Sequence, residues 1–250
     1  MMLLSLPNEI LIVIVHGILD RKDKVNLASC SRRLLELLLP YAYETVTVNS
    51  TCKQAVSRLT TTVIRNKTLA PAVRHIRLIE GSCKHRRKLL VHRQVIDYAL
   101  QFASTDCETQ EWRDALLGRG IKWCDGQGDA WKAVLFSLLR NLETLEMYWE
   151  DVIEFQLRVF ERAAMQRNHT EDRQVLPRLQ DVRLLGGERL DVAEVKIFFL
   201  LPSMRKLSCY FINDTPMGDD LPERTSPIRE LSLYHSLTST GFSTAHSFLC

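Results

Sequence analysis

Short segments of one form recur along the chain from about residue 70 onward. Each has the spacing apolar-x-x-apolar-x-apolar, and a proline lies one or two residues before four of the five. Alternation of apolar and polar positions is typical of a strand that buries one face. The five segments are VRHIRL (73–78), LETLEM (142–147), LQDVRL (179–184), MRKLSC (204–209) and IRELSL (228–233).

Helical patterns precede four of these segments, at 51–65, 129–140, 151–167 and 191–201. The segments begin 69, 37, 25 and 24 residues apart, and the last two intervals fall in the range of leucine-rich repeats, about 20–29 residues. We therefore expect an α/β fold that resembles an irregular leucine-rich-repeat-like solenoid, with parallel strands on a concave face. An ordinary α/β domain with a parallel sheet is the alternative. The asparagine or cysteine that such repeats place after the strand is missing at Gly81, Glu150, Gly187, Ile212 and Ser236.

The long first interval requires either an extra unit or an insertion. Residues 84–128 contain the basic run KHRRK (84–88) and four glycines, and we interpret them as an insertion, one helix flanked by loops. At the other end, SLTSTGFSTAHSFLC (236–250) is expected to begin a further helix without its following strand. Repeat arrays normally end in a polar cap, so this ending suggests a truncated chain or an oligomer that covers the exposed end.

Near the start, LPNEILIVIV (6–15) contains six consecutive aliphatic residues. The run is too short for a membrane span of about 20 residues, and no basic segment precedes it as in a signal peptide. Pro7 and Glu9 favour the first turn of a helix. The helical stripe is predicted to comprise Ile10, Leu11, Ile14, Val15 and Ile18, with Ile12 and Val13 outside it. Such a helix is apolar on nearly all sides.

Two further short helices are expected after this one. Asp20 or Asp23 is placed to cap the second, and Ser31 is placed to cap a third that ends at Pro40. Segments below about 40 residues rarely support a core of their own, so three short helices cannot enclose so apolar a helix. Its surplus surface requires a partner, or else a neighbouring domain that these helices cap.

The same residues resemble the F-box motif across 4–48. The resemblance rests on Leu6-Pro7-x-Glu9-Ile10-Leu11, Ile14, Leu19-Asp20, Asp23, Leu27 and Cys30-Ser31-Arg32-Arg33-Leu34, and LPYAYETVTV (39–48) is similar to the segment that follows the motif in many fungal members. Lys24 departs from the pattern, which usually has an aliphatic residue there. The family binds a Skp-type adaptor and through it a cullin-RING ubiquitin ligase. The resemblance implies that the adaptor contacts Leu6, Pro7, Ile10, Ile14, Leu19, Val25 and Leu27.

This interpretation divides the chain into an F-box-like helical module at 1–48 and an α/β repeat region at 49–250. Charge differs along the chain, because residues 1–100 carry 16 Lys/Arg against 7 Asp/Glu and the remainder 17 against 23. The seven cysteines lack close pairs, which is typical of reduced thiols in a cytoplasmic or nuclear protein. Cys107 and Cys124 are a weak metal candidate, and we expect neither a metal nor a cofactor.

No nucleotide-binding loop, nucleophile elbow or paired-histidine metal motif occurs, so we expect a non-catalytic protein. The favoured function is the substrate receptor of a Skp–cullin–F-box type ubiquitin ligase. A scaffold that assembles proteins without ubiquitination is the alternative, and nucleic-acid binding through KHRRK, which also resembles a nuclear import signal or a solvated loop, is a minor one. Polar strand positions are candidates to contact an unknown client, or are plain solvated residues: Arg74, Arg77, Glu143, Glu146, Arg183, Lys206 and Glu230.

Overall fold

A computed structural model describes most of the chain. The described residues are 5–18, 20–49, 53–79, 91, 93–103, 105–119, 125–149, 153–165, 174–190, 192–212, 226–236 and 243–249. The helices are α1 (Asn8–Ile18), α2 (Arg21–Ser29), α3 (Arg32–Tyr43), α4 (Lys53–Arg65), α5 (Arg93–Ala99), α6 (Asp106–Leu117), α7 (Asp125–Leu138), α8 (Glu154–Met165) and α9 (Val192–Phe199). The strands are β1 (Thr45–Asn49), β2 (His75–Ile79), β3 (Thr144–Trp149), β4 (Asp181–Leu190), β5 (Lys206–Ile212), β6 (Glu230–Ser236) and β7 (Ser243–Leu249). Short 3₁₀ turns lie at Ala70–Ala72 and Leu100–Phe102.

The strands form one sheet in sequence order, β1 to β7. All neighbours from β1 to β6 are parallel, and β7 alone runs antiparallel, beside β6. His75 pairs with Thr144, Thr144 with Asp181, Asp181 with Lys206, and Lys206 with Glu230, the offsets that the five recurring segments predict. The predicted α/β class and all five strands are confirmed. The first strand, β1, was not predicted, and the expected boundary at residue 48 lies within it.

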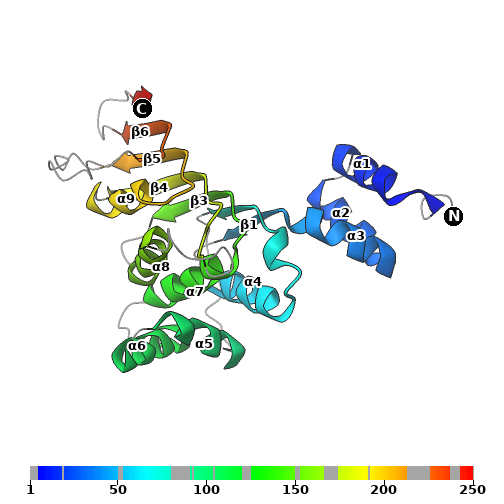
Figure 1. Ribbon diagram of the computed structural model, residues 1–250, viewed down its shortest axis with the longest axis horizontal. Helices are drawn as coiled ribbons and strands as arrows, with labels where there is room; N and C mark the ends of the chain where they lie inside the picture. The colour runs from blue at the N-terminus through cyan, green and yellow to red at the C-terminus, as the bar shows by residue number, and fades with distance from the viewer. Residues whose placement is uncertain are drawn as a thin grey trace.

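The helices from α4 to α9 lie on one face of the sheet (Figure 1). Helices α4, α7, α8 and α9 form the layer beside the strands, and α5 and α6 lie outside α7 as a further layer. The four helices predicted to precede recurring segments are present as α4, α7, α8 and α9. The predicted insertion contains two helices and a 3₁₀ turn among its described residues, not the one helix expected, and its last residues already belong to α7.

A repeated hydrogen-bond pattern joins the starts of successive strands. At each step one carbonyl accepts two consecutive backbone N–H groups of the next strand, at N···O distances of 2.7–3.0 Å. The accepting carbonyls belong to Glu44, Arg74, Glu143, Gln180 and Arg205. Side chains join the turns as well, since Asn141 donates to Pro71 O at 2.8 Å and Ser203 donates to Pro177 O. These contacts satisfy backbone groups at the turns, although the asparagine or cysteine expected after each strand is missing.

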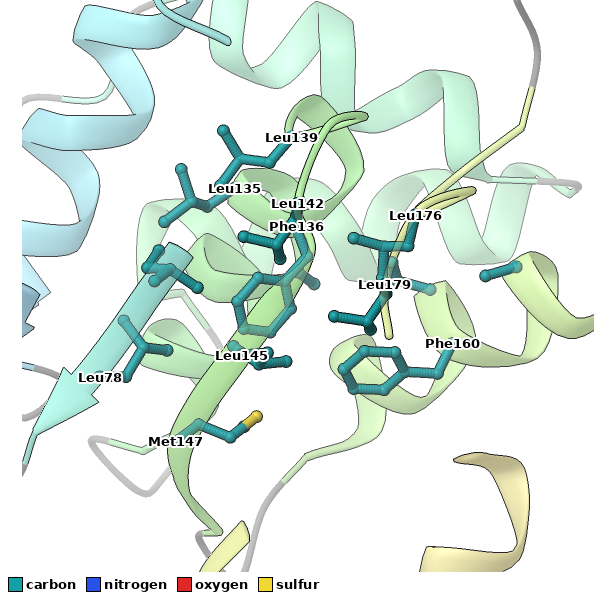
Figure 2. Packing of buried hydrophobic residues seen from close by; sticks show 14 of the residues in the cluster. Leu78, Leu135, Phe136, Leu139, Leu142, Leu145, Met147, Phe160, Leu176 and Leu179 are labelled. Atoms are coloured by element: carbon teal, nitrogen blue, oxygen red, sulfur yellow. The ribbon is translucent and has the colours of Figure 1, made fainter. Parts of the chain in front are cut away.

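The main core lies between the sheet and the helices (Figure 2). Apolar positions of the recurring segments stack from strand to strand, so that Leu78 is followed by Met147 and Leu184, all fully or nearly fully buried. Phe160 of α8 belongs to the same buried cluster and lies beside Leu179. Contact between stacked apolar positions explains why each segment keeps the same spacing.

A second, smaller core holds the three amino-terminal helices together. It consists of Leu11, Val15, Ala28, Leu34 and Leu38, with Leu6, Leu27 and Leu37 packed against it. The Asp20 carboxylate accepts from Asp23 N at 2.8 Å and caps α2, and the Ser31 hydroxyl accepts from Leu34 N at 3.2 Å and caps α3. The module lies at the end of the molecule opposite β6 (Figure 1).

Two local predictions are wrong. Helix α3 continues through the exposed Pro40 to Tyr43, because its last turn buries Ala42 and packs Tyr43 against the main core. Tertiary packing there outweighs the hydrogen bond that proline removes. The segment 243–249 forms strand β7 and not a helix, and it pairs with the otherwise open edge of β6.

Candidate functional site

Helix α1 presents an exposed apolar face. Leu11 and Val15 are 0% and 1% exposed in the small core, whereas Ile10 and Val13 are 47% and 68% exposed. With the half-buried Ile14, these two residues have the i, i+3, i+4 spacing of one helical face. The predicted stripe is therefore wrong in part, because it combined core and surface residues and left out Val13. The spacing of Val13 from Ile10 was the signal that identifies the outer face.

The other residues that the F-box resemblance places against an adaptor differ in exposure. Pro7 is exposed and Val25 is 45% exposed on α2, so both add to the accessible surface of the module. Leu6 and Leu27 are half-buried and pack against the small core. Leu19 lies outside the described residues.

Arg33 holds the start of α1 against α3. Its guanidinium donates to Leu6 O at 2.9 Å and to Asn8 Oδ1 at 2.8 Å. Arg32, by contrast, is paired only along its own helix, with Glu36 at 2.9 Å, and its side chain is 90% exposed. In the Ser-Arg-Arg triplet, Ser31 and Arg33 therefore position helices while Arg32 remains on the surface.

The second candidate surface is the sheet face that no described helix covers (Figure 1). The predicted client-contacting residues on the strands lie here, but all seven predicted residues are engaged with one another or with neighbours. Arg77 donates twice to Glu146 Oε1, at 2.8 and 3.0 Å, and Lys206 pairs with Glu230 at 2.5 Å. Arg74 pairs with Glu143 at 3.3 Å, and Arg183 lies 3.9 Å from Glu146 and 3.6 Å from Asp181. Exposed pairs of this kind contribute little stability, yet they hold the side chains in a fixed pattern.

A shallow pocket of about 270 Å³ lies among these pairs, between β1 and β4. His75 and Thr144 line it and are joined by a 2.8 Å contact between His75 Nδ1 and Thr144 Oγ1. Asp181 also lines it, and burial raises the pKa of its carboxyl above the ordinary value. The pocket presents hydrogen-bonding groups and charged side chains of both signs.

An apolar row on the same face was missed by the sequence analysis. The row comprises Ile79, Tyr148, Leu185, Tyr210 and Tyr234, which pair in register or continue the register of neighbouring strands. The rings of Tyr210 and Tyr234 stack with centroids 4.3 Å apart. Each of these residues directly follows one recurring segment, so extending the six-residue pattern by one position would have identified them. The face thus carries aromatic anchors of the kind that protein interfaces favour.

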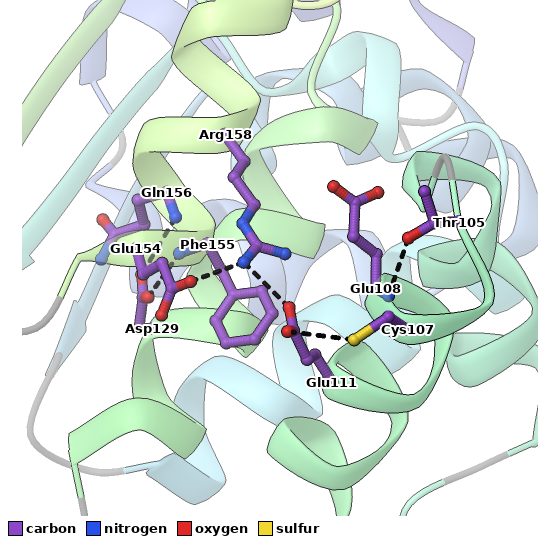
Figure 3. A network of polar contacts seen from close by, with 9 residues as sticks. All are labelled: Thr105, Cys107, Glu108, Glu111, Asp129, Glu154, Phe155, Gln156 and Arg158. Atoms are coloured by element: carbon purple, nitrogen blue, oxygen red, sulfur yellow. Dashed lines mark hydrogen bonds and ion pairs between the residues drawn. The ribbon is translucent and has the colours of Figure 1, made fainter.

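Inside the helical layer, a buried carboxylate caps α8 (Figure 3). Both Asp129 oxygens accept backbone N–H groups, from Phe155 at 2.7 Å and Gln156 at 3.1 Å, and Asp129 is fully buried. Burial raises the pKa of this carboxyl to about 6. Arg158 on the same helix joins Glu154 at 2.5 Å and Glu111 of α6 at 2.9 Å, which ties the insertion to α8. These groups stabilise helix ends and packing, and their hydrogen bonds are directed at the protein itself.

The described residues contain no cluster of three or more potential metal ligands. The Cys107 Sγ atom lies 3.8 Å from Glu111 Oε1, and both residues are on α6. Cys124 and the basic run at 84–88 lie outside the described residues. Among the described helices, none has the length and apolar character needed to cross a bilayer.

Comparison with protein-family models, with curated proteins and with solved structures finds no match to this chain.

Proposed function

We propose that the chain is the substrate receptor of a Skp–cullin–F-box type ubiquitin ligase. The amino-terminal module would bind the adaptor, and the sheet would hold a client within reach of a ligase-bound conjugating enzyme. Such a receptor accelerates transfer by proximity and needs no reactive group of its own.

The observation that carries this proposal is the outer face of α1. Val13 is 68% and Ile10 47% exposed on a module whose own core holds five buried side chains among the described residues. Val25 and Leu35 add exposed apolar area, at 45% and 43%. An apolar face such as that of Ile10, Val13 and Ile14 on so small a module is typical of a protein-binding site.

We also propose that the sheet and its helices form an irregular leucine-rich-repeat-like solenoid. Every strand pairs only with the strands before and after it in sequence, and the last parallel intervals are 25 and 24 residues. The repeated double acceptor at each turn supports the same interpretation. The uncovered face, with its ion pairs and its tyrosines, would then be the client-binding face.

The test is an affinity measurement between residues 1–250 and an immobilised Skp-type adaptor. Ile10→Asp/Ile14→Asp should weaken binding at least 100-fold, because two apolar contacts are lost and charges are placed in their position. Val13→Asp, at the most exposed position of the face, should weaken it at least tenfold with little effect on folding. Met165→Asp on α8, where the side chain is 81% exposed, introduces the same charge elsewhere and serves as the control.

Circular dichroism should show that all variants are folded. Wild-type protein that fails to bind, or binding that the α1 variants leave unchanged, contradicts the proposal. Co-purification of a cullin with the adaptor distinguishes a ligase subunit from a scaffold that only shares the adaptor.

A further inference from the structure

Four exposed arginines lie at the end of the sheet where strands β3 to β6 begin. They are Arg140, Arg178, Arg205 and Arg229. The guanidinium groups of these four make no hydrogen bond and no ion pair with any residue of the described part, unlike the arginines on the sheet face. We refer to these four residues as the arginine row.

The arginine row comes from consecutive turns. Arg140 precedes β3, Arg178 precedes β4, and Arg205 and Arg229 directly precede β5 and β6. Arg229 N donates to Arg205 O at 2.8 Å, and Arg205 N donates to Gln180 O at 2.8 Å, so these turns are stacked like the strands that follow them. With a strand spacing of about 4.8 Å, the four turns extend over roughly 14 Å.

Among the described residues, the carboxylates near the arginine row are engaged with other cations. Glu143 is paired with Arg74, Glu230 with Lys206, and Asp181 lies beside Arg183. Helix carboxyl ends also attract cations, but only Arg140 lies within two residues of a helix end. The positive charge of this end of the sheet therefore faces solvent without a partner in the described structure.

We propose that the arginine row binds an extended acidic segment of a partner protein. About five consecutive Asp or Glu residues extend roughly 17 Å, which matches the length of the row, and arginine forms two-pronged hydrogen bonds with carboxylates. That the partner is a ubiquitination client rests on the proposed function, whereas binding of the acidic segment does not.

Composition around the row favours a peptide over a nucleic acid. Proteins that bind single-stranded nucleic acid without sequence preference combine a positive groove with aromatic rings on which bases stack. The turns here carry Pro177, Pro202 and Ser203. The apolar row lies four residues after the start of each of β3 to β6, roughly 13 Å along the strand. Carboxylates bound at the turns need no stacking surface.

The test uses residues 1–250 and a fluorescein-labelled ten-residue glutamate peptide in a fluorescence-anisotropy titration. Arg140→Gln/Arg178→Gln/Arg205→Gln/Arg229→Gln should lower affinity roughly 30-fold, at about two- to threefold for each exposed ion pair lost. A control variant removes the same charge at exposed arginines elsewhere, and should lose less than threefold: Arg32→Gln/Arg58→Gln/Arg93→Gln/Arg119→Gln. Both should retain the wild-type circular dichroism spectrum.

Equal losses in the two variants would indicate attraction by net charge alone and overturn the proposal. So would tighter binding of a 20-nucleotide oligouridine with the same sensitivity to the row, or binding only to vesicles containing anionic lipid. Ile10→Asp/Ile14→Asp should leave the peptide affinity unchanged, and the arginine-row variant should leave adaptor affinity unchanged. Failure of one proposal is therefore visible separately from failure of the other.

Discussion

Truncating Leu38 to alanine should unfold most of the amino-terminal module while the sheet stays folded. Leu38 is fully buried in the small core of five side chains, and a Leu→Ala change in a core costs about 2–5 kcal/mol. A single core in so small a segment rarely supplies more than about 3–5 kcal/mol. The loss is therefore comparable to the whole stability of the module. The main core contains none of the five residues and should be unaffected.

Hydrogen exchange followed by mass spectrometry measures this directly. Amides of α1 and α2 should lose protection in Leu38→Ala, whereas those of β2 to β5 keep it, and the last turn of α3 keeps part of it through Tyr43. Leu35→Ala, on the same helix with a 43% exposed side chain, is the matched control and should change exchange little. Uniform loss of protection across the sheet would refute the reasoning, because it would mean that the two cores unfold as one.

Asp129→Ala should lower the free energy of unfolding by about 2 kcal/mol, since two buried amides lose their acceptor while a desolvated carboxylate is removed. Asp97→Ala on the surface of α5 should change it by less than about 0.5 kcal/mol in the same urea titration. Burial raises the pKa of Asp129 from the ordinary value of 3.8 to about 6, so the folded state binds this proton more tightly than the unfolded state does. Lowering the pH from 7 to 4 should therefore stabilise wild type relative to Asp129→Ala by up to about 3 kcal/mol. An equal stability difference between the two proteins at pH 7 and at pH 5 would contradict this. Burial raises the pKa of Cys209 to about 12, so iodoacetamide should modify Cys30 and Cys107 in native protein and Cys209 only after denaturation, as peptide mass mapping would reveal.

The sheet was predictable because its signal is repeated. One apolar spacing recurs five times, because in each copy the apolar positions stack on those of the neighbouring strand in the core. The intervals between copies therefore equal the observed pairing offsets. Single occurrences were less informative. Strand β1 has the same alternation of buried and exposed positions in TVTVN (45–49). This segment directly follows the amino-terminal helices and was not recognised as one of the recurring segments. Strand β7 depends on the open edge of β6, a property of the assembled sheet that the sequence of 243–249 alone does not contain.

The candidate surfaces were predicted in part for a similar reason. Hydrophobicity identified α1 as an unusual helix, but which of its sides faces inward depends on Leu34 and Leu38 of α3, residues over twenty positions away. Alternation placed five of the seven charged positions on the correct face, whereas Arg74 and Glu143 directly precede β2 and β3. Their mutual pairing, such as that of Arg77 with Glu146, depends on strands 69 residues apart becoming neighbours.

The direct pairing of β2 with β3 has a practical consequence for engineering. Their paired residues are 69 positions apart, yet the register is the same as between strands only 24 positions apart. For a flexible connection the closure entropy grows only as the logarithm of its length, so the longer one costs about 1 kcal/mol more. The connection between β2 and α5, which precedes the packed helices α5 and α6, should therefore accept a foreign folded domain, such as a fluorescent protein whose ends lie close together, without displacing a single strand.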